Sequence, residues 1–111
     1  MIEHGTNENG EYYKYGNVLI CTKKVHYNGG TTIPWGSLYE SEAIDLGNWA
    51  HEFTDVPVIQ ITTRAIDGGY TCHEGINSPT KSQIGTTFLF RPTSTVGIKV
   101  SIQVVGIGLW R

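Results

Sequence analysis

The sequence predicts an all-β fold, a single antiparallel β-sandwich (jelly-roll-like) of about seven or eight strands. Composition is the first reason: the chain has 12 Ile, 8 Val and 13 Thr against 3 Ala and 5 Leu, and β-branched side chains favour pleated strands over helices. The second is the spacing of turn residues, because 14 Gly and 4 Pro divide the chain at short intervals. The third is length, since 111 residues suit one core.

The N-terminal part contains a predicted hairpin. Residues 1–10 are polar and without periodicity, so we expect a linker to an upstream region, followed by the sandwich domain at residues 11–111. A short strand at 12–15, a Gly16-Asn17 turn and a strand at 18–27 form the hairpin. We expect Asn28, Gly29 and Gly30 to end it.

The middle of the chain alternates irregular segments with strands. Residues 31–44 predict one edge strand around 38–44. Residues 46–53 have helical spacing and predict a turn or a single helical turn. Residues 56–65 form a predicted strand with Ile59 and Ile61 on one face, and residues 70–76 form another before a loop at 77–85.

The last strands carry the clearest alternation. Residues 86–91 predict a strand with Phe88 and Phe90 inward, and residues 98–104 alternate apolar with polar side chains. Beyond them the apolar residues change parity: Val105, Ile107 and Leu109 fall on the opposite face. Either a bulge near Val104 and Val105 or burial on both faces would account for this.

Charge and composition exclude several classes of protein. Eight Lys and Arg against ten Asp and Glu leave no basic field for nucleic acid. No apolar run approaches a membrane span of about 20 residues, so we expect no membrane insertion. The N-terminus lacks the pattern of a signal peptide. Two cysteines are too few for a disulfide scaffold, so Cys21 and Cys72 are expected to be thiols, Cys21 in the core.

Three segments in order resemble a known family. They are GTNENGEYYKYGNVLICTKKV, FTDVPVIQITTRA and TFLFRPTSTVGIKVSIQVVGIGLWR, which together extend over most of residues 5–111. The chain resembles the C-terminal tip domain of bacteriophage and prophage tail fibres, and its FTDVPVI segment, in place of the "F-x-x-x-P-x-V" step, and its terminal "I-G-x-W" are also similar to H-type lectins. Leu109 stands where that ending commonly has a polar or basic residue.

The resemblance implies a homotrimer at the distal end of a fibre, carried on the virion tail after synthesis in the bacterial cytoplasm. It implies contact with a host cell-surface glycan or protein, without a cofactor. The residues that fall on the motifs would be structural: Phe53, Pro57, Val58, Ile107, Gly108 and Trp110. No sugar-binding triplet of the lectins aligns, so glycan binding is an expectation for the class.

Two loop clusters have the residue types that bind sugars. Aromatic rings stack on the C–H face of a pyranose, while carboxylates, amides and imidazoles bond its hydroxyls. The first cluster is Trp35, Tyr39 and Glu40; the second is Asp67, Tyr70, His73 and Glu74. For any one aromatic residue, packing at a sheet edge or subunit contact is the main alternative.

Metal binding and catalysis have weaker support. Cys72 and His73 are adjacent on a predicted strand and would point to opposite faces, so we expect no metal site. The carboxylates Glu40, Glu42, Asp45, Glu52 and Asp55 raise the possibility of a glycan-degrading enzyme, but a domain of 12.3 kDa seldom forms the required cleft. We therefore expect no enzyme.

The sequence thus favours a receptor-binding tip domain of a tail fibre. A structural trimerisation cap without its own ligand is the alternative, and a glycan-degrading enzyme is less favoured. In both fibre hypotheses the C-terminal strand forms the threefold contact through Val105, Ile107 and Leu109, because an apolar stripe on a second face needs a partner to cover it.

Overall fold

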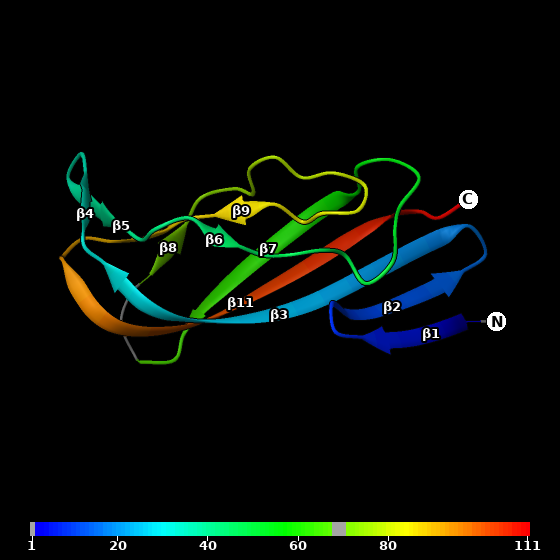
Figure 1. The fold of residues 1–111 in the computed structure, drawn as a ribbon, viewed down its shortest axis with the longest axis horizontal. Coiled ribbons are helices and arrows are strands. Elements are labelled where there is room, and N and C mark those ends of the chain that lie inside the picture. The colour runs from blue at the N-terminus through cyan, green and yellow to red at the C-terminus, as the bar shows by residue number, and fades with distance from the viewer. Residues whose placement is uncertain (1, 68–70) are drawn as a thin grey trace.

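The computed structural model describes residues 2–67 and 71–111, which form an elongated β-sandwich with extents of 47 × 23 × 18 Å. Figure 1 shows long strands running most of its length, with short strands and loops over one face. The described residues contain no helix, so none is present there that could cross a membrane. The predicted all-β class is confirmed. These residues form eleven strands rather than seven or eight, and several of the eleven are only two or three residues long.

The strands form three antiparallel sheets. The five-stranded sheet contains, in spatial order, β1 (Ile2–Asn7), β2 (Gly10–Tyr15), β3 (Val18–Thr31), β11 (Thr95–Leu109) and β7 (Val58–Ala65). The four-stranded sheet contains β4 (Ile33–Trp35), β5 (Leu38–Glu40), β10 (Leu89–Arg91) and β8 (Cys72–His73). The third sheet pairs β6 (Ile44–Asp45) with β9 (Thr86–Thr87).

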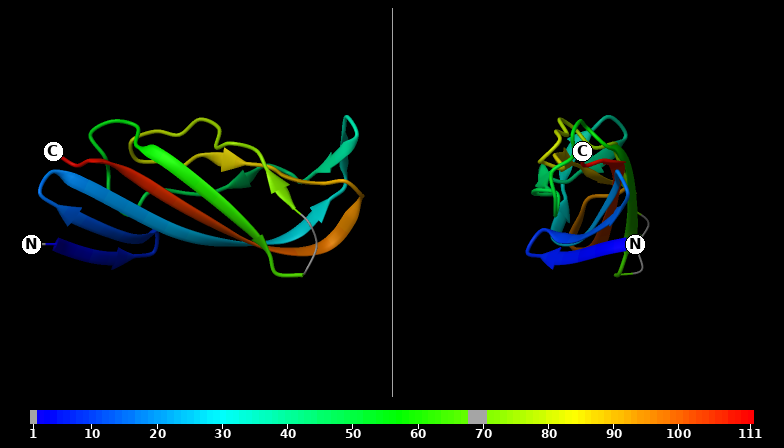
Figure 2. Two further views of the ribbon diagram at one scale, coloured as in Figure 1. Left: turned by 180° about the vertical axis from the view of Figure 1, so that it is seen from behind. Right: turned by 90° about the vertical axis from the view of Figure 1, so that its right-hand side faces the viewer.

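The core lies between the five-stranded sheet and the layer formed by the short sheets and loops (Figure 2). From β11 it receives Ile98, Val100, Ile102 and Val104, each at most 1% exposed. The covering layer contributes large apolar side chains from irregular chain as well as from strands. These are Ile44, Leu46, Trp49, Phe53, Ile84 and Leu89.

The C-terminal strand keeps one register along the core. Its pairing with β3 runs without interruption from Ile98 to Leu109, so the first of the two alternatives, a bulge near Val104 and Val105, is wrong. The next two inward-facing positions of β11 are glycines, Gly106 and Gly108, and aromatic rings pack over them. A Cβ on Gly106 would lie 2.7 Å from the Trp49 ring, and one on Gly108 would lie 3.0 Å from the Phe53 ring.

The predicted first hairpin forms, with Gly16 in the turn at φ 59°. Two expectations around it are corrected. Residues 2–7 are not irregular chain but strand β1, paired with β2. Strand β3 also does not end at residues 28–30, because β11 pairs with it as far as Thr31 and the Tyr27 ring covers Gly29.

Two further local expectations are corrected. Residues 46–53 contain no helical turn; their apolar side chains are buried because this irregular segment crosses the sheet. The predicted strand at 86–91 is broken at Phe88 into β9 and β10. The inward face is also the opposite of the predicted one: Thr87 and Leu89 are fully buried, whereas Phe90 faces the other side of its sheet.

The two cysteines lie in different sheets. Cys21, on β3, is fully buried as predicted, and burial raises the pKa of its thiol. Cys72, on β8, is exposed, and no disulfide joins it to Cys21.

Candidate functional site

The end of the molecule farthest from the end of β11 carries the β4–β5 hairpin (Figure 1). Its two strands are joined by Gly36 and Ser37, and Gly36 has a φ of 60°, the left-handed conformation that short hairpin turns require. The hairpin holds Trp35 at the margin of the four-stranded sheet. The Trp35 side chain is 57% exposed.

Four side chains form what we call the Trp35 surface, on the face of the four-stranded sheet that points away from the core. Strand pairing places Ile33 opposite Glu40 and Glu40 opposite Phe90. Trp35 lies two residues from Ile33 on the same face. Its ring contacts that of Phe90, with centroids 5.3 Å apart and planes inclined by 49°.

The Trp35 surface has the chemistry that the first predicted cluster required. Phe90 is only 8% exposed, so it supports the Trp35 ring from below and leaves most of that ring open to solvent. Glu40 supplies a carboxylate on the same face. An indole platform beside a hydrogen-bond acceptor can bind a sugar ring or an apolar side chain of another protein.

The other residue of the first cluster, Tyr39, does not join this surface. It lies opposite Arg91 on the alternate parity of the sheet, which also contains Leu89 and His73. The side chains on this face are largely buried: Leu89 is fully inaccessible and Arg91 is 6% exposed. Tyr39 and His73 are thus separated from Trp35 by the sheet itself.

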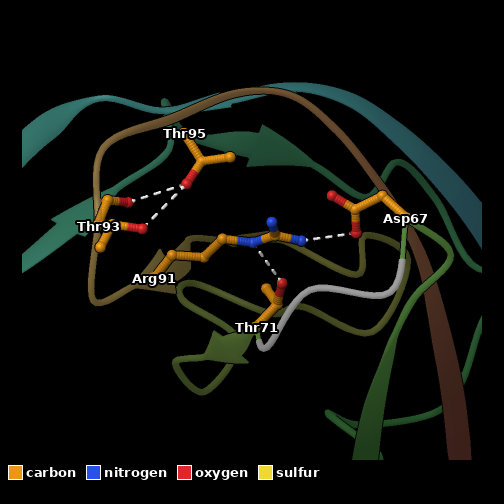
Figure 3. A network of polar contacts seen from close by, with 5 residues as sticks. All are labelled: Asp67, Thr71, Arg91, Thr93 and Thr95. Atoms are coloured by element: carbon orange, nitrogen blue, oxygen red, sulfur yellow. Dashed lines mark hydrogen bonds and ion pairs between the residues drawn. The ribbon is translucent and has the colours of Figure 1, made fainter.

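Arg91 also accounts for Asp67, the first residue of the second predicted cluster. Its guanidinium donates one hydrogen bond to the Asp67 carboxylate at 2.8 Å and another to the Thr71 hydroxyl at 2.8 Å. Figure 3 shows this buried arginine between the two ends of the β7–β8 connection, beside the Thr93 and Thr95 turn. Asp67 therefore has a structural partner.

The rest of the second cluster does not form a site together. His73 bonds through Nδ1 to the main-chain oxygen of Glu74 at 3.0 Å. The Glu74 carboxylate accepts a hydrogen bond from the Asn77 amide. Tyr70, the aromatic member of this cluster, lies outside the described residues.

Sequence reasoning missed Ile33 and Phe90. A signal for Ile33 was present, because Gly36-Ser37 between two alternating triplets is a typical two-residue hairpin. Nothing in the sequence signalled Phe90, since the alternation of residues 86–91 does not show that Thr87 and Leu89, rather than the phenylalanines, face the core.

The opposite end of the molecule carries a second exposed surface, on the face of the five-stranded sheet away from the core. Strand pairing aligns Ile2, Tyr15, Val18 and Leu109 in one row across four strands. All four are exposed. We call this row and the next one, which contains Ile20 and Ile107, the apolar rows.

The predicted interface residues lie at these rows. Ile107 is 45% exposed and Leu109 is 50% exposed, and Val105 follows on the same face beside Thr22. Their outward orientation agrees with the parity argument from the sequence. β1 begins and β11 ends at this same end (Figure 1).

Trp110 links the end of β11 to the β2–β3 turn. The Trp110 indole N–H donates to the main-chain oxygen of Gly16 at 2.9 Å. The Lys14 ammonium lies 4.1 Å and the Arg111 guanidinium 4.7 Å from the ring centroid. Trp110 is therefore structural, as the sequence predicted.

Two hollows lack the aromatic lining of a sugar site. One of about 430 Å³ lies where β2 begins beside β3, next to Val105, and is lined by residues such as Lys23 and Lys24. Another of about 370 Å³ lies between the loops around Asp45 and Asn77. Neither is lined by an aromatic ring, and the described residues hold no group of three or more side chains that could bind a metal.

Comparisons with known proteins add no identification. No family model, no curated protein and no solved structure matches the chain.

Proposed function

We propose that this domain is the receptor-binding tip of a phage or prophage tail fibre, which attaches to a glycan or protein on a bacterial surface. The observation that carries the proposal is the division of the molecule into two unlike ends. The apolar rows lie where β1 begins and β11 ends, and the Trp35 surface lies at the other end of the 47 Å axis.

Each end suits one task of such a tip. Exposed apolar rows are typical of surfaces that a partner chain covers, and in a fibre that partner is a second and third copy of the chain. The opposite end then points away from the fibre and is free to contact the host. Several Trp35 surfaces on one trimer would strengthen attachment through avidity, even where each site binds weakly.

The ligand class that fits best is a saccharide of the cell surface. A half-exposed indole with a carboxylate beside it offers stacking to the apolar face of a sugar and hydrogen bonding to its hydroxyls. A protein receptor would use the same ring as an apolar anchor.

The experiment compares Trp35→Ala with Val96→Ala in the intact fibre. Val96 is 78% exposed and belongs to the same end of the molecule, but it is not part of the Trp35 surface. We expect Trp35→Ala to weaken binding to bacterial cells and arrayed surface glycans by about tenfold per site, equivalent to about 1.4 kcal/mol. Val96→Ala should bind like the unmodified fibre.

Deletion of this domain from the fibre tests the alternative of a structural cap, which the apolar rows also favour. A shortened fibre that binds cells as well as the unmodified one would support the cap. Undiminished binding by Trp35→Ala would contradict the assignment of the site.

A further inference from the structure

Strand β7 is an open edge of the five-stranded sheet. Over the described ranges, 2–67 and 71–111, it pairs with β11 on one side and with no strand on the other. The pairing extends along the whole strand, from Val58 opposite Ile107 to Ala65 opposite Val100. One side of an eight-residue backbone is therefore unpaired with any strand.

The hydrogen-bond pattern shows which residues face this open side. The Ile66 N–H donates to the Lys99 oxygen at 2.8 Å, which makes these two residues a hydrogen-bonded pair of the ladder. Because such pairs alternate in an antiparallel ladder, the even residues of β7 bond to β11. The odd residues, 59, 61, 63 and 65, point their N–H and C=O groups outward.

This edge has few of the devices by which proteins prevent strand addition. Strand β7 contains no Pro and no Lys, and its register against β11 shows no bulge. Its one charged residue is Arg64. By contrast, the part of β3 that extends beyond β2 begins with Lys23 and Lys24. The β7 edge is open to pairing, whereas the β3 edge is protected.

We propose that β7 pairs in antiparallel orientation with β7 of a second copy of the chain, across a twofold axis at Thr62. This register places Ile59 opposite Ala65 of the other copy and Ile61 opposite Thr63. Every outward-pointing N–H and C=O of the edge then meets a complementary group. The edge is thus self-complementary, which is what a twofold contact requires.

Other registers would also pair the outward-pointing N–H and C=O groups of the odd residues, and the side chains favour this one. On the outer face it places Val58, which is 72% exposed, opposite Ile66, which is 51% exposed, so two apolar side chains cover one another. It also places Arg64 opposite Gln60, which keeps the two arginines apart. Moving the axis to Ile61 or Thr63 separates Val58 from Ile66.

The contact is independent of the proposed fibre role. It uses the edge of the five-stranded sheet, whereas the threefold contact uses Val105, Ile107 and Leu109 on its outer face, and Val58 borders both. One can therefore fail while the other holds. If both form, two trimers are joined through β7.

The test is self-crosslinking of one introduced cysteine, with the buried Cys21 left in place. Thr62 would face Thr62 of the second copy as a non-hydrogen-bonded pair, in which Cα atoms are about 4.5 Å apart and a disulfide can form. The matched control is Gln60→Cys, on the same strand and face, whose two copies would lie about 13 Å apart along the strands. Both variants are made in the full chain with Cys72→Ser.

We expect Thr62→Cys to form a disulfide-linked dimer at least about tenfold faster than Gln60→Cys under mild oxidation, because pairing raises the effective thiol concentration. Adding Thr63→Pro should remove this difference while the fold persists by circular dichroism, since the Thr63 N–H points to the open side and not to β11. Equal rates for the two cysteine variants would overturn the proposal. So would undiminished crosslinking with Thr63→Pro.

Discussion

At the scale of single residues, the C-terminal glycines are explained by the rings packed over them. Gly106 and Gly108 lie on the inward face of β11, beneath Trp49 and Phe53. The aromatic side chains of an irregular segment and the glycines of a strand are complementary, and a pattern of alternating apolar residues cannot reveal that relation.

We predict that Gly106→Ala lowers the free energy of unfolding by about 1–3 kcal/mol, because the new methyl would lie 2.7 Å from the Trp49 ring in a packed core. Denaturant unfolding measures the loss. Gly75→Ala is the control, since a Cβ there meets no atom within 4 Å and the backbone is not left-handed. Equal stability of the two variants would contradict the packing argument.

At the scale of elements, the long strands were predictable and the covering layer was not. Strands β3, β7 and β11 alternate over eight or more residues, so local sequence determines their inward face. The covering layer consists of strands of two or three residues whose position depends on contacts distant in sequence, such as Ser41 with Leu89. This is why Trp35 was found but its neighbour Phe90 was assigned inward, and why Tyr39 was grouped on the wrong face.

Arg91 links β10 to the β7–β8 connection, and we predict that this link is important for stability. Asp67→Ala should cost about 3 kcal/mol, because it leaves the guanidinium, whose side chain is 7% exposed, without its carboxylate. Glu3→Ala is the control: it breaks the exposed 3.3 Å pair with Lys14 and should cost less than about 1 kcal/mol. Chemical denaturation of both variants measures the difference, and similar costs would show that the buried pair has no special role.

At the scale of the whole molecule, the outward face of β11 carries apolar side chains that a single chain leaves exposed. The core side of β11 is complete, with four side chains at most 1% exposed. Its other side presents Ile107 and Leu109 in rows that continue across β3 and β2 to Tyr15 and Ile2. An exposed apolar surface across four strands is uncommon on a monomer and is expected to be an interface.

We predict that the chain assembles in multiples of three through these rows and that Ile107→Asp prevents this assembly. Ile107 lies between Ile20 and Val58 in its row, so a carboxylate there would be desolvated in the contact at a cost of several kcal/mol. In the separate chain the same position is 45% exposed, so the variant should still fold. Light scattering above micromolar concentration should give three or six chains for the unmodified protein and one or two for Ile107→Asp. A mass of one or two chains for the unmodified protein would refute the threefold contact, whereas Lys99→Asp, on the same face but beyond the rows, should leave the mass unchanged.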